Sequence, residues 1–239
     1  MTAVFWIVKI LTTGMGETAS DYLARVLGPV PAVASAALVL AAALAAQART
    51  RRCVPAVYWF AVIMVSVFGT MAADVAHVAL GVPYALSAGA FAVALALVFV
   101  LWRWTEGTLA VETVAGGRRE VYYWTVVMAT FALGTAVGDL TAATLGWGYL
   151  PSALLFAVLI ALPAPARRLL AVSPVLAFWW AYVLTRPLGA SFADWAGVGA
   201  ERGGLGLGTG PVSLVLAVII VATVLWLSAA ERRAPQQVT

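Results

Sequence analysis

Residues 6–21 read WIVKILTTGMGETASD, and the spacing of three residues within this stretch recurs along the chain. Trp6 is followed after ten residues by Gly16 and after five more by Asp21. The same spacing returns at Trp59, Gly69 and Asp74, at Trp124, Gly134 and Asp139, and at Trp179, Gly189 and Asp194. Four such matches indicate an internal repeat, because the bias of the chain toward Ala, Val and Leu does not produce them.

The composition predicts that these repeats lie in a membrane. Of the 239 residues, 64% are apolar and 10% are charged, and the mean hydropathy is +1.00. A soluble domain is excluded, because charged residues make up about a quarter of such domains. The apolar blocks are long enough for helices of roughly 20 residues to cross the hydrocarbon core. The first block is expected to be a span and not a cleaved signal peptide, because no basic segment precedes it.

Each copy contains two apolar segments and predicts a helical hairpin. In the first three copies the pairs Leu27-Gly28, Leu80-Gly81 and Leu145-Gly146 mark the turn, and the fourth has GVGAERGGLGLGTG, which we interpret as a lengthened turn or a mobile gate. Two spans return the chain to its starting side, so the copies are parallel duplications. We expect an all-α integral membrane protein with a single transmembrane domain, residues 1–239. Its eight transmembrane helices would form four hairpins in a pseudo-fourfold arrangement, with the odd-numbered helices innermost. The repeats cover residues 4–48, 55–102, 121–166 and 174–229, and the spans are 4–26 and 30–48, 55–80 and 84–102, 121–145 and 149–166, and 174–196 and 210–229.

The distribution of basic residues predicts the orientation. Most arginines fall between repeats or in the tail: Arg49, Arg51, Arg52, Arg103, Arg118, Arg119, Arg167, Arg168, Arg232 and Arg233. By the positive-inside rule these linkers and both termini are cytoplasmic, in a bacterial inner membrane. The net charge of +4 therefore indicates topology and not a nucleic-acid partner. The four repeated tryptophans would form an aromatic belt at the headgroups, and the lone Cys53 excludes an internal disulfide.

Ionisable residues inside the predicted spans are the candidate functional groups, since a charge at this depth is costly unless it is paired or hydrated. We expect the two bases, Lys9 and Arg186, each to pair with an acid. The acids are Glu17, Asp21, Asp74, Asp139 and Asp194.

Glu17 and Asp21 lie one helical turn apart and share a face, flanked by Thr13 and Thr18. Two carboxylates on one poorly hydrated face do not both ionise easily, so we expect one to hold a proton. The pair is thereby the candidate cation or metal site, since oxygen ligands suit hard cations. On this basis, Glu17→Gln would abolish the pH dependence of transport and leave folding intact, whereas replacing Lys9 would mainly impair folding.

His77 follows Asp74 by three residues and shares its helical face, which makes it a further candidate, while Thr70 takes the place that Glu17 holds in the first copy. A purely structural interpretation is also open. The repeated glycines would let helices approach closely, and each Asp would hydrogen-bond a neighbouring group and fasten the hairpins together.

The stretches WIVKILTTGMGETASDYL, VFGTMAADVAHVALGVP, TFALGTAVGDLTAATLGWGY and YVLTRPLGASFADW resemble a bacterial family of uncharacterised, repeat-containing integral membrane proteins. The resemblance covers most of the chain and implies no particular activity. There is a looser similarity to manganese and calcium exporters built from acidic helical repeats. Those exporters carry a Glu-x-Gly-Asp-Lys/Arg signature, whereas GETASD lacks its Gly-Asp-basic core.

These observations favour a transporter or exporter of a small cation, with a divalent ion such as Mn²⁺ as the candidate substrate. Transport would be coupled to protons through the carboxylates in the membrane. The expected partners are the lipid bilayer, the cation and protons, with no nucleic acid, no cofactor and no enzymatic activity; a homo-oligomer is left open. The alternative is a membrane scaffold or sensor that does not transport. A third interpretation is a membrane enzyme or haem protein centred on His77.

Overall fold

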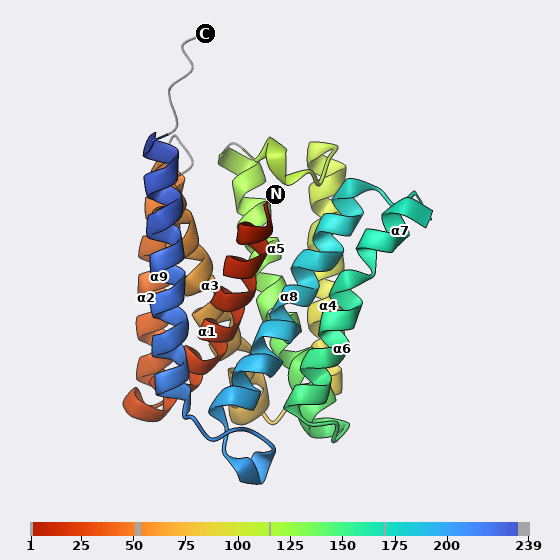
Figure 1. The fold of residues 1–239 in the computed structure, drawn as a ribbon. Helices are drawn as coiled ribbons and strands as arrows, with labels where there is room; N and C mark the ends of the chain where they lie inside the picture. The colour runs from red at the N-terminus through yellow and green to blue at the C-terminus, as the bar shows by residue number, and fades with distance from the viewer. Residues whose placement is uncertain (1, 51–53, 115, 170, 234–239) are drawn as a thin grey trace.

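The computed structural model describes residues 2–50, 54–114, 116–169 and 171–233, and every regular element within them is helical. Cys53, Arg51 and Arg52 lie outside the described residues. The chain runs up and down through long helices, and the start of α1 lies at the same end as the end of α9 (Figure 1). The α-helices are α1 (Ala3–Leu27), α2 (Pro29–Arg49), α3 (Pro55–Asp74), α4 (Tyr84–Glu106), α5 (Gly117–Asp139), α6 (Tyr149–Ala161), α7 (Pro163–Leu169), α8 (Pro174–Gly197) and α9 (Thr209–Arg233).

The turn inside each of the first three hairpins contains the predicted glycine. Gly28, Gly81 and Gly146 have φ angles of 84°, 64° and 70°, a region that glycine enters without steric cost. The hairpins are α1 with α2, α3 with α4, and α5 with α6. The chain can therefore reverse within a few residues, as the Leu-Gly pairs predict.

The fourth hairpin, α8 with α9, has an ordered turn in place of a tight one. Its backbone folds onto the end of α8, where the amide of Leu205 donates to the carbonyl of Trp195 at 2.7 Å and that of Gly206 to the carbonyl of Val198 at 2.8 Å. A short 3₁₀ turn, η4 (Ala200–Arg202), lies within it. These bonds fit the interpretation of a lengthened turn.

One predicted span is interrupted. The segment 149–166 was expected to be a single helix, but α6 ends at Ala161 and α7 starts at Pro163. Pro163 and Pro165 have no N–H to donate to the preceding turn, so the regular helix cannot continue through them.

The long helices form an inner and an outer layer. The inner helices α1, α3, α5 and α8 carry most of the buried residues and contact one another in the order α1, α3, α5, α8 and back to α1. Each outer helix packs mainly on the inner helix of the following repeat: α2 on α3, α4 on α5, α6 on α8, and α9 on α1. Consecutive repeats are thereby interlocked, and the first long helix of each repeat is innermost, as predicted.

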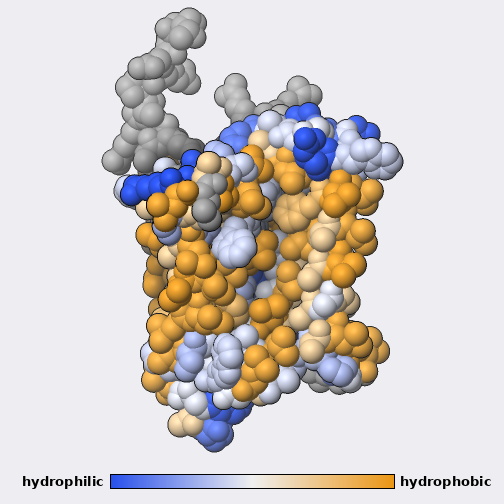
Figure 2. All heavy atoms as spheres, turned by 90° about the vertical axis from the view of Figure 1, so that its right-hand side faces the viewer, coloured by the Kyte–Doolittle hydropathy of each residue, from blue (hydrophilic) through white to orange (hydrophobic). Residues whose placement is uncertain are grey.

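The outside of the structure is that of a multi-pass membrane protein. A broad apolar surface separates two ends rich in polar residues (Figure 2). Among the described residues, six helical segments are long and apolar enough to cross a membrane: 29–49, 55–77, 84–106, 117–144, 149–169 and 209–229. The prediction of eight crossings is supported for these six. The remaining long helices, α1 and α8, are outside this set because polar side chains such as Lys9, Glu17 and Arg186 lower their hydropathy.

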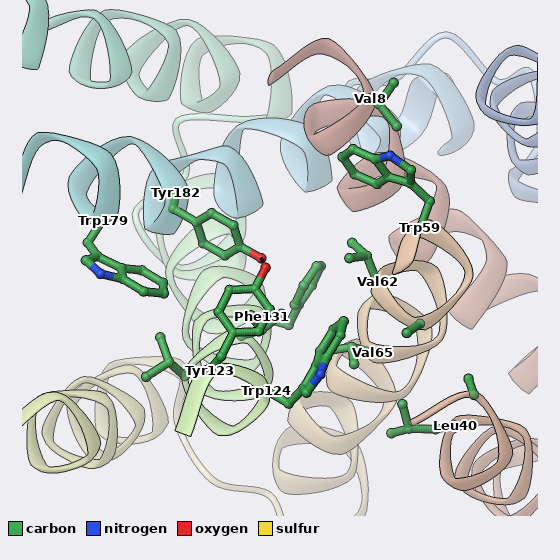
Figure 3. Close-up of a cluster of buried hydrophobic side chains, with 14 of the residues drawn as sticks. Val8, Leu40, Trp59, Val62, Val65, Tyr123, Trp124, Phe131, Trp179 and Tyr182 are labelled. Carbon is green, nitrogen blue, oxygen red and sulfur yellow. Dashed lines mark hydrogen bonds between the residues drawn. The ribbon is translucent and has the colours of Figure 1, made fainter. Parts of the chain in front are cut away.

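The largest apolar core lies where the inner helices begin, and it contains three of the four repeated tryptophans. Trp59, Trp124 and Trp179 are 5%, 9% and 4% exposed and belong to one buried cluster with Tyr123 and Tyr182 (Figure 3). The expectation that the repeated tryptophans form a headgroup belt is wrong for these three. These three rings are covered by other residues of the apolar core, so they face protein and not lipid.

Candidate functional site

The repeated glycine of each inner helix marks its closest contact with the next inner helix. A Cβ atom at Gly16 would collide with Ser66 of α3, and one at Gly69 with Phe131 of α5. Gly134 is blocked in the same way by Arg186 of α8, and Gly189 by Thr13 of α1. Each blocking residue lies three positions before the glycine of its own helix, so one contact recurs around a closed ring of helices. The glycines therefore allow the close approach that the structural interpretation assigned to them.

Arg186 projects from α8 into the middle of this ring and makes a contact with each of the other inner helices. Its Nη2 donates to Glu17 Oε2 at 2.5 Å, to Thr135 Oγ1 at 2.7 Å and to the hydroxyl of Thr70. Its Nη1 donates to the carbonyl oxygen of Thr13 at 2.8 Å. The expected pairing of Arg186 with an acid is thus found with Glu17, in an ion pair whose side chains are 1% and 6% exposed.

The three side chains that accept hydrogen bonds from Arg186 Nη2 occupy equivalent positions in their repeats. Glu17, Thr70 and Thr135 each follow the repeated glycine directly, and the fourth copy has Ala190 there. One helix thus supplies the guanidinium, and the other three supply oxygens at the same level. A nearly symmetrical frame therefore holds an asymmetrical charge pair.

The four repeated aspartates lie one turn further along the same helices. Asp194 is buried and Asp21, Asp74 and Asp139 are half-buried. Each of the four carboxyls is repelled by Glu17 and attracted by Arg186. The ring of inner helices therefore gathers five acids into one electrostatic group.

No hydrogen bond or ion pair engages these four aspartate side chains in the part of the chain that the structure describes. The structural interpretation required each Asp to bond a neighbouring group, so its account of the aspartates is not supported. Two of the aspartates also mark a change in helix geometry. A π-helical turn begins directly after Asp74 (η1, Val75–Ala79) and after Asp139 (η3, Leu140–Thr144), and such turns occur frequently at functional sites.

Lys9 makes no pair with an acid, contrary to our expectation. Its side chain is fully buried, and its Nζ has no hydrogen-bond partner among the described residues. Nζ lies 4.3 Å from the centroid of the Phe131 ring and 4.4 Å from that of Tyr182. The aromatic faces of two neighbouring helices take the place of a carboxylate.

The remaining candidates lie around this centre in supporting positions. The hydroxyl of Thr13 donates to the carbonyl of Thr185 at 3.0 Å, and Thr18 accepts a hydrogen bond from Ser213 of α9 at 2.8 Å. These two threonines join α1 to α8 and to α9.

His77 sits in the turn between α3 and α4. Its Nδ1 is 2.8 Å from the carbonyl oxygen of Val82 and its Nε2 is 3.1 Å from Ser87 Oγ. The ring also lies against Tyr84, with centroids 3.8 Å apart. Because both nitrogens are engaged in the hairpin, the geometry gives no support to a haem or catalytic role.

The carboxylates do not assemble a chelating metal site. Across the described residues, no three His, Cys, Asp or Glu side chains are grouped closely enough to hold a metal ion. Glu17, one half of the candidate pair, is engaged by Arg186. A cation at this end of the molecule would therefore meet dispersed negative charge and not a ready set of ligands.

Sequence reasoning missed one charged group near the aspartates. Arg202, in the turn of the fourth hairpin, donates to the hydroxyl of Tyr149 at 2.6 Å and attracts the carboxyls of Asp21 and Asp194. The signal was the presence of a base in the one turn that is longer than the others.

Comparison with known proteins identifies a family. A family model described as Repeat of Unknown Function (DUF347) matches the chain four times, over residues 4–53, 57–108, 122–166 and 177–233. No curated protein and no solved structure gives a match. The chain belongs to the DUF347 repeat family.

Proposed function

We propose that this four-repeat DUF347 protein is a multi-pass membrane transporter that exchanges a small cation for protons. The observation that carries the proposal is the group of four Asp side chains at equivalent positions of the inner helices, without hydrogen-bond or ion-pair partners among the described residues. Groups that only fasten helices together have partners, whereas these carboxyls are available to a ligand.

The charge balance of the group favours a cation. Glu17 is offset by Arg186, and Arg202 attracts only part of the remaining negative charge. A cluster of carboxylates inside apolar walls concentrates cations. Protons and other cations compete for the same carboxylates, so binding of one displaces the other and provides a physical basis for exchange.

The spacing of the carboxylates bears on which cation could bind. Mn²⁺ and other chelated metals require several ligands at once, and the described residues do not form such a set. The experiment below therefore includes monovalent cations beside Ca²⁺ and Mn²⁺.

The transport proposal includes a topology. We place the protein in a bacterial inner membrane with eight crossings, adding α1 and α8 to the six apolar segments. These two helices are 25 and 24 residues long, enough for the hydrocarbon core at 1.5 Å per residue, and the ring of neighbours covers their polar faces. The inner helices would surround a pseudo-fourfold axis normal to the membrane, with the linkers between repeats and both termini in the cytoplasm.

Cysteine labelling tests this topology. In a Cys53→Ser background, a cysteine at Glu112, between the second and third repeats, should react only from the cytoplasmic side. A cysteine at Leu205, in the turn of the fourth hairpin, should react from outside. Labelling of both from the same side would refute the topology.

Flux in proteoliposomes tests the function. Purified protein would be given Na⁺, K⁺, Ca²⁺ or Mn²⁺ with and without a pH gradient, and an internal pH dye would report proton movement. We expect one of these cations to drive proton efflux, and we expect Asp139→Asn and Asp194→Asn to reduce it at least tenfold. Glu112→Gln is the matched control, because Glu112 is an exposed acid in a linker and should not affect flux. No movement of any cation, or full flux in both Asp variants, would favour the scaffold interpretation.

A further inference from the structure

Lys9 is a buried charged residue of the inner helices that has no role in the proposed cation site. It is the only lysine of the chain and lies in α1, eight residues before Glu17. Its amine is fully buried without a hydrogen bond among the described residues. A buried donor left unsatisfied is costly, and an apolar residue would fill the same space without that cost.

The groups facing Lys9 act on its charge in opposite directions. The like-charged guanidinium of Arg186 contacts the same Phe131 ring as Lys9 and opposes a second positive charge there. The faces of Phe131 and Tyr182, at 4.3 and 4.4 Å from Nζ, stabilise a positive charge on Lys9. Because no acid fixes the charge, both the ammonium and the amine are accessible in this position.

A connected set of hydroxyl groups starts at Tyr182, whose ring face contacts the Lys9 amine without a hydrogen bond to it, and leads away from the acidic end. Tyr182, whose ring lies under the amine, has its hydroxyl 3.5 Å from that of Tyr123. The hydroxyl of Tyr123 lies 2.7 Å from that of Tyr58. Figure 3 shows the hydroxyls of Tyr123 and Tyr182 pointing toward one another from neighbouring helices. Phe131 is fully buried and contacts the side chains of both Lys9 and Arg186, with its ring centroid 5.2 Å from Arg186 Cζ.

We propose that Lys9 carries the exchanged proton between the acidic end of the inner helices and the tyrosine hydroxyls. This inference rests on the proposed function and names the residue that couples proton movement to it. Asp21 and Lys9 are separated by about 18 Å along α1, at 1.5 Å per residue, a distance too long for one direct transfer. Lys9 provides a group between the two ends that can accept and release a proton.

The transfer conserves charge at each step. The lone pair of the neutral amine accepts a proton from the acidic side, which leaves a carboxylate there and an ammonium at Lys9. The hydroxyl oxygen of Tyr182 then accepts a proton from the ammonium and gives up its own to Tyr123, which does the same to Tyr58. Half-buried Tyr58 releases a proton to water, so each hydroxyl is unchanged and the neutral amine is restored. No oxidant, reductant or further reactant is involved.

The protonation of Lys9 can be observed directly because the chain has no other lysine. Protein labelled with [ζ-¹⁵N]lysine should give a single side-chain nitrogen signal in nanodiscs. We expect this signal to move between its ammonium and amine positions within the pH range in which the protein is folded and active. A signal that keeps its ammonium position throughout that range would overturn the proposal.

Two conservative variants test the role in coupling. Lys9→Arg keeps a positive charge between the two rings but does not release its proton, because arginine stays protonated in proteins. We expect pH-driven cation uptake to fall at least tenfold in Lys9→Arg, while counterflow of labelled cation, which needs no net proton movement, falls less than twofold. Tyr182→Phe keeps the ring and removes the hydroxyl, and it should reduce pH-driven uptake in the same selective way.

The outcomes separate this inference from the proposed function. Normal coupling in Lys9→Arg would overturn the role of Lys9, as would equal losses of uptake and counterflow in that variant. Absence of any cation flux in the wild-type protein would refute the proposed function itself. Circular dichroism and size-exclusion elution of each variant would establish that it is folded before its transport is compared.

Discussion

Replacing Glu17 by Gln probes the ion pair on which the inner helices converge. Gln has nearly the shape of Glu and keeps an oxygen that can accept from Arg186, but it removes the negative charge. Arg186 then holds its charge among the oxygens of Thr13, Thr70 and Thr135 with no counter-charge bonded to it. Because arginine does not lose its proton in proteins, the site cannot relax by becoming neutral.

The expected effect is large because both side chains are almost inaccessible, with exposed fractions of 1% and 6%. Removing one partner of a buried ion pair lowers the free energy of unfolding by about 3–5 kcal/mol. We expect a loss near the lower end, about 3 kcal/mol, since the three threonine oxygens and the Gln amide still accept hydrogen bonds. The sequence alone led to the opposite expectation, that Glu17→Gln leaves folding intact.

Reversible unfolding in mixed micelles would measure this loss. Glu106→Gln is the matched control, because Glu106 also binds two arginines, Arg118 at 2.6 Å and Arg119 at 2.8 Å, but in a pair where Arg118 is 70% exposed. It should lose much less stability. The double variant Glu17→Gln, Arg186→Met should recover part of the loss, since it leaves no unpaired charge. The reasoning is wrong if Glu17→Gln is no less stable than Glu106→Gln.

Three further substitutions, one of them with a matched control, test other contacts. Gly134→Ala should lower the free energy of unfolding by about 1–3 kcal/mol, because its Cβ would collide with Arg186. Gly138→Ala on the same helix is the control and should be neutral or stabilising in the same assay, because its Cβ would meet Ser191 Oγ at 3.6 Å and Pro187 Cα at 4.0 Å, both ordinary contacts. His77→Ala should cost about 1–3 kcal/mol in thermal unfolding, because its contacts with Val82 and Ser87 are lost; an unchanged melting temperature would contradict this. Tyr149→Phe should leave the helices intact but expose the turn 198–208 to limited proteolysis, because Arg202 loses its hydroxyl acceptor; an unchanged cleavage rate would show that this bond does not hold the turn.

The repeated glycines and the repeated aspartates have different physical roles, although both recur at the same spacing. The glycines are in contact with the next helix in all four copies, so their role is packing. The aspartates, five residues later, have side chains without a hydrogen bond or ion pair among the described residues. A function that needs available carboxyls is therefore compatible with a frame held together by glycine contacts.

The sequence by itself determined the helical hairpins, their turns and the inventory of polar groups in the apolar region. These features depend on local properties: apolar length, the φ freedom of Gly28, Gly81 and Gly146, and residue spacing. Hydropathy alone predicted one helix over residues 149–166. The helix instead ends at Ala161, because Pro163 has no N–H with which to continue it.

Only the tertiary structure decided which polar groups meet. Arg186 lies on the fourth repeat and Glu17 on the first, and they pair because the ring of inner helices closes between α8 and α1. Lys9 faces Phe131 and Tyr182 of two other helices, where aromatic faces and not a carboxylate surround the amine. Trp59, Trp124 and Trp179 are buried because neighbouring elements of the fold cover the starts of the inner helices. Rotation and order of helices around a ring are set by long-range packing, and spacing along one helix carries no information about them.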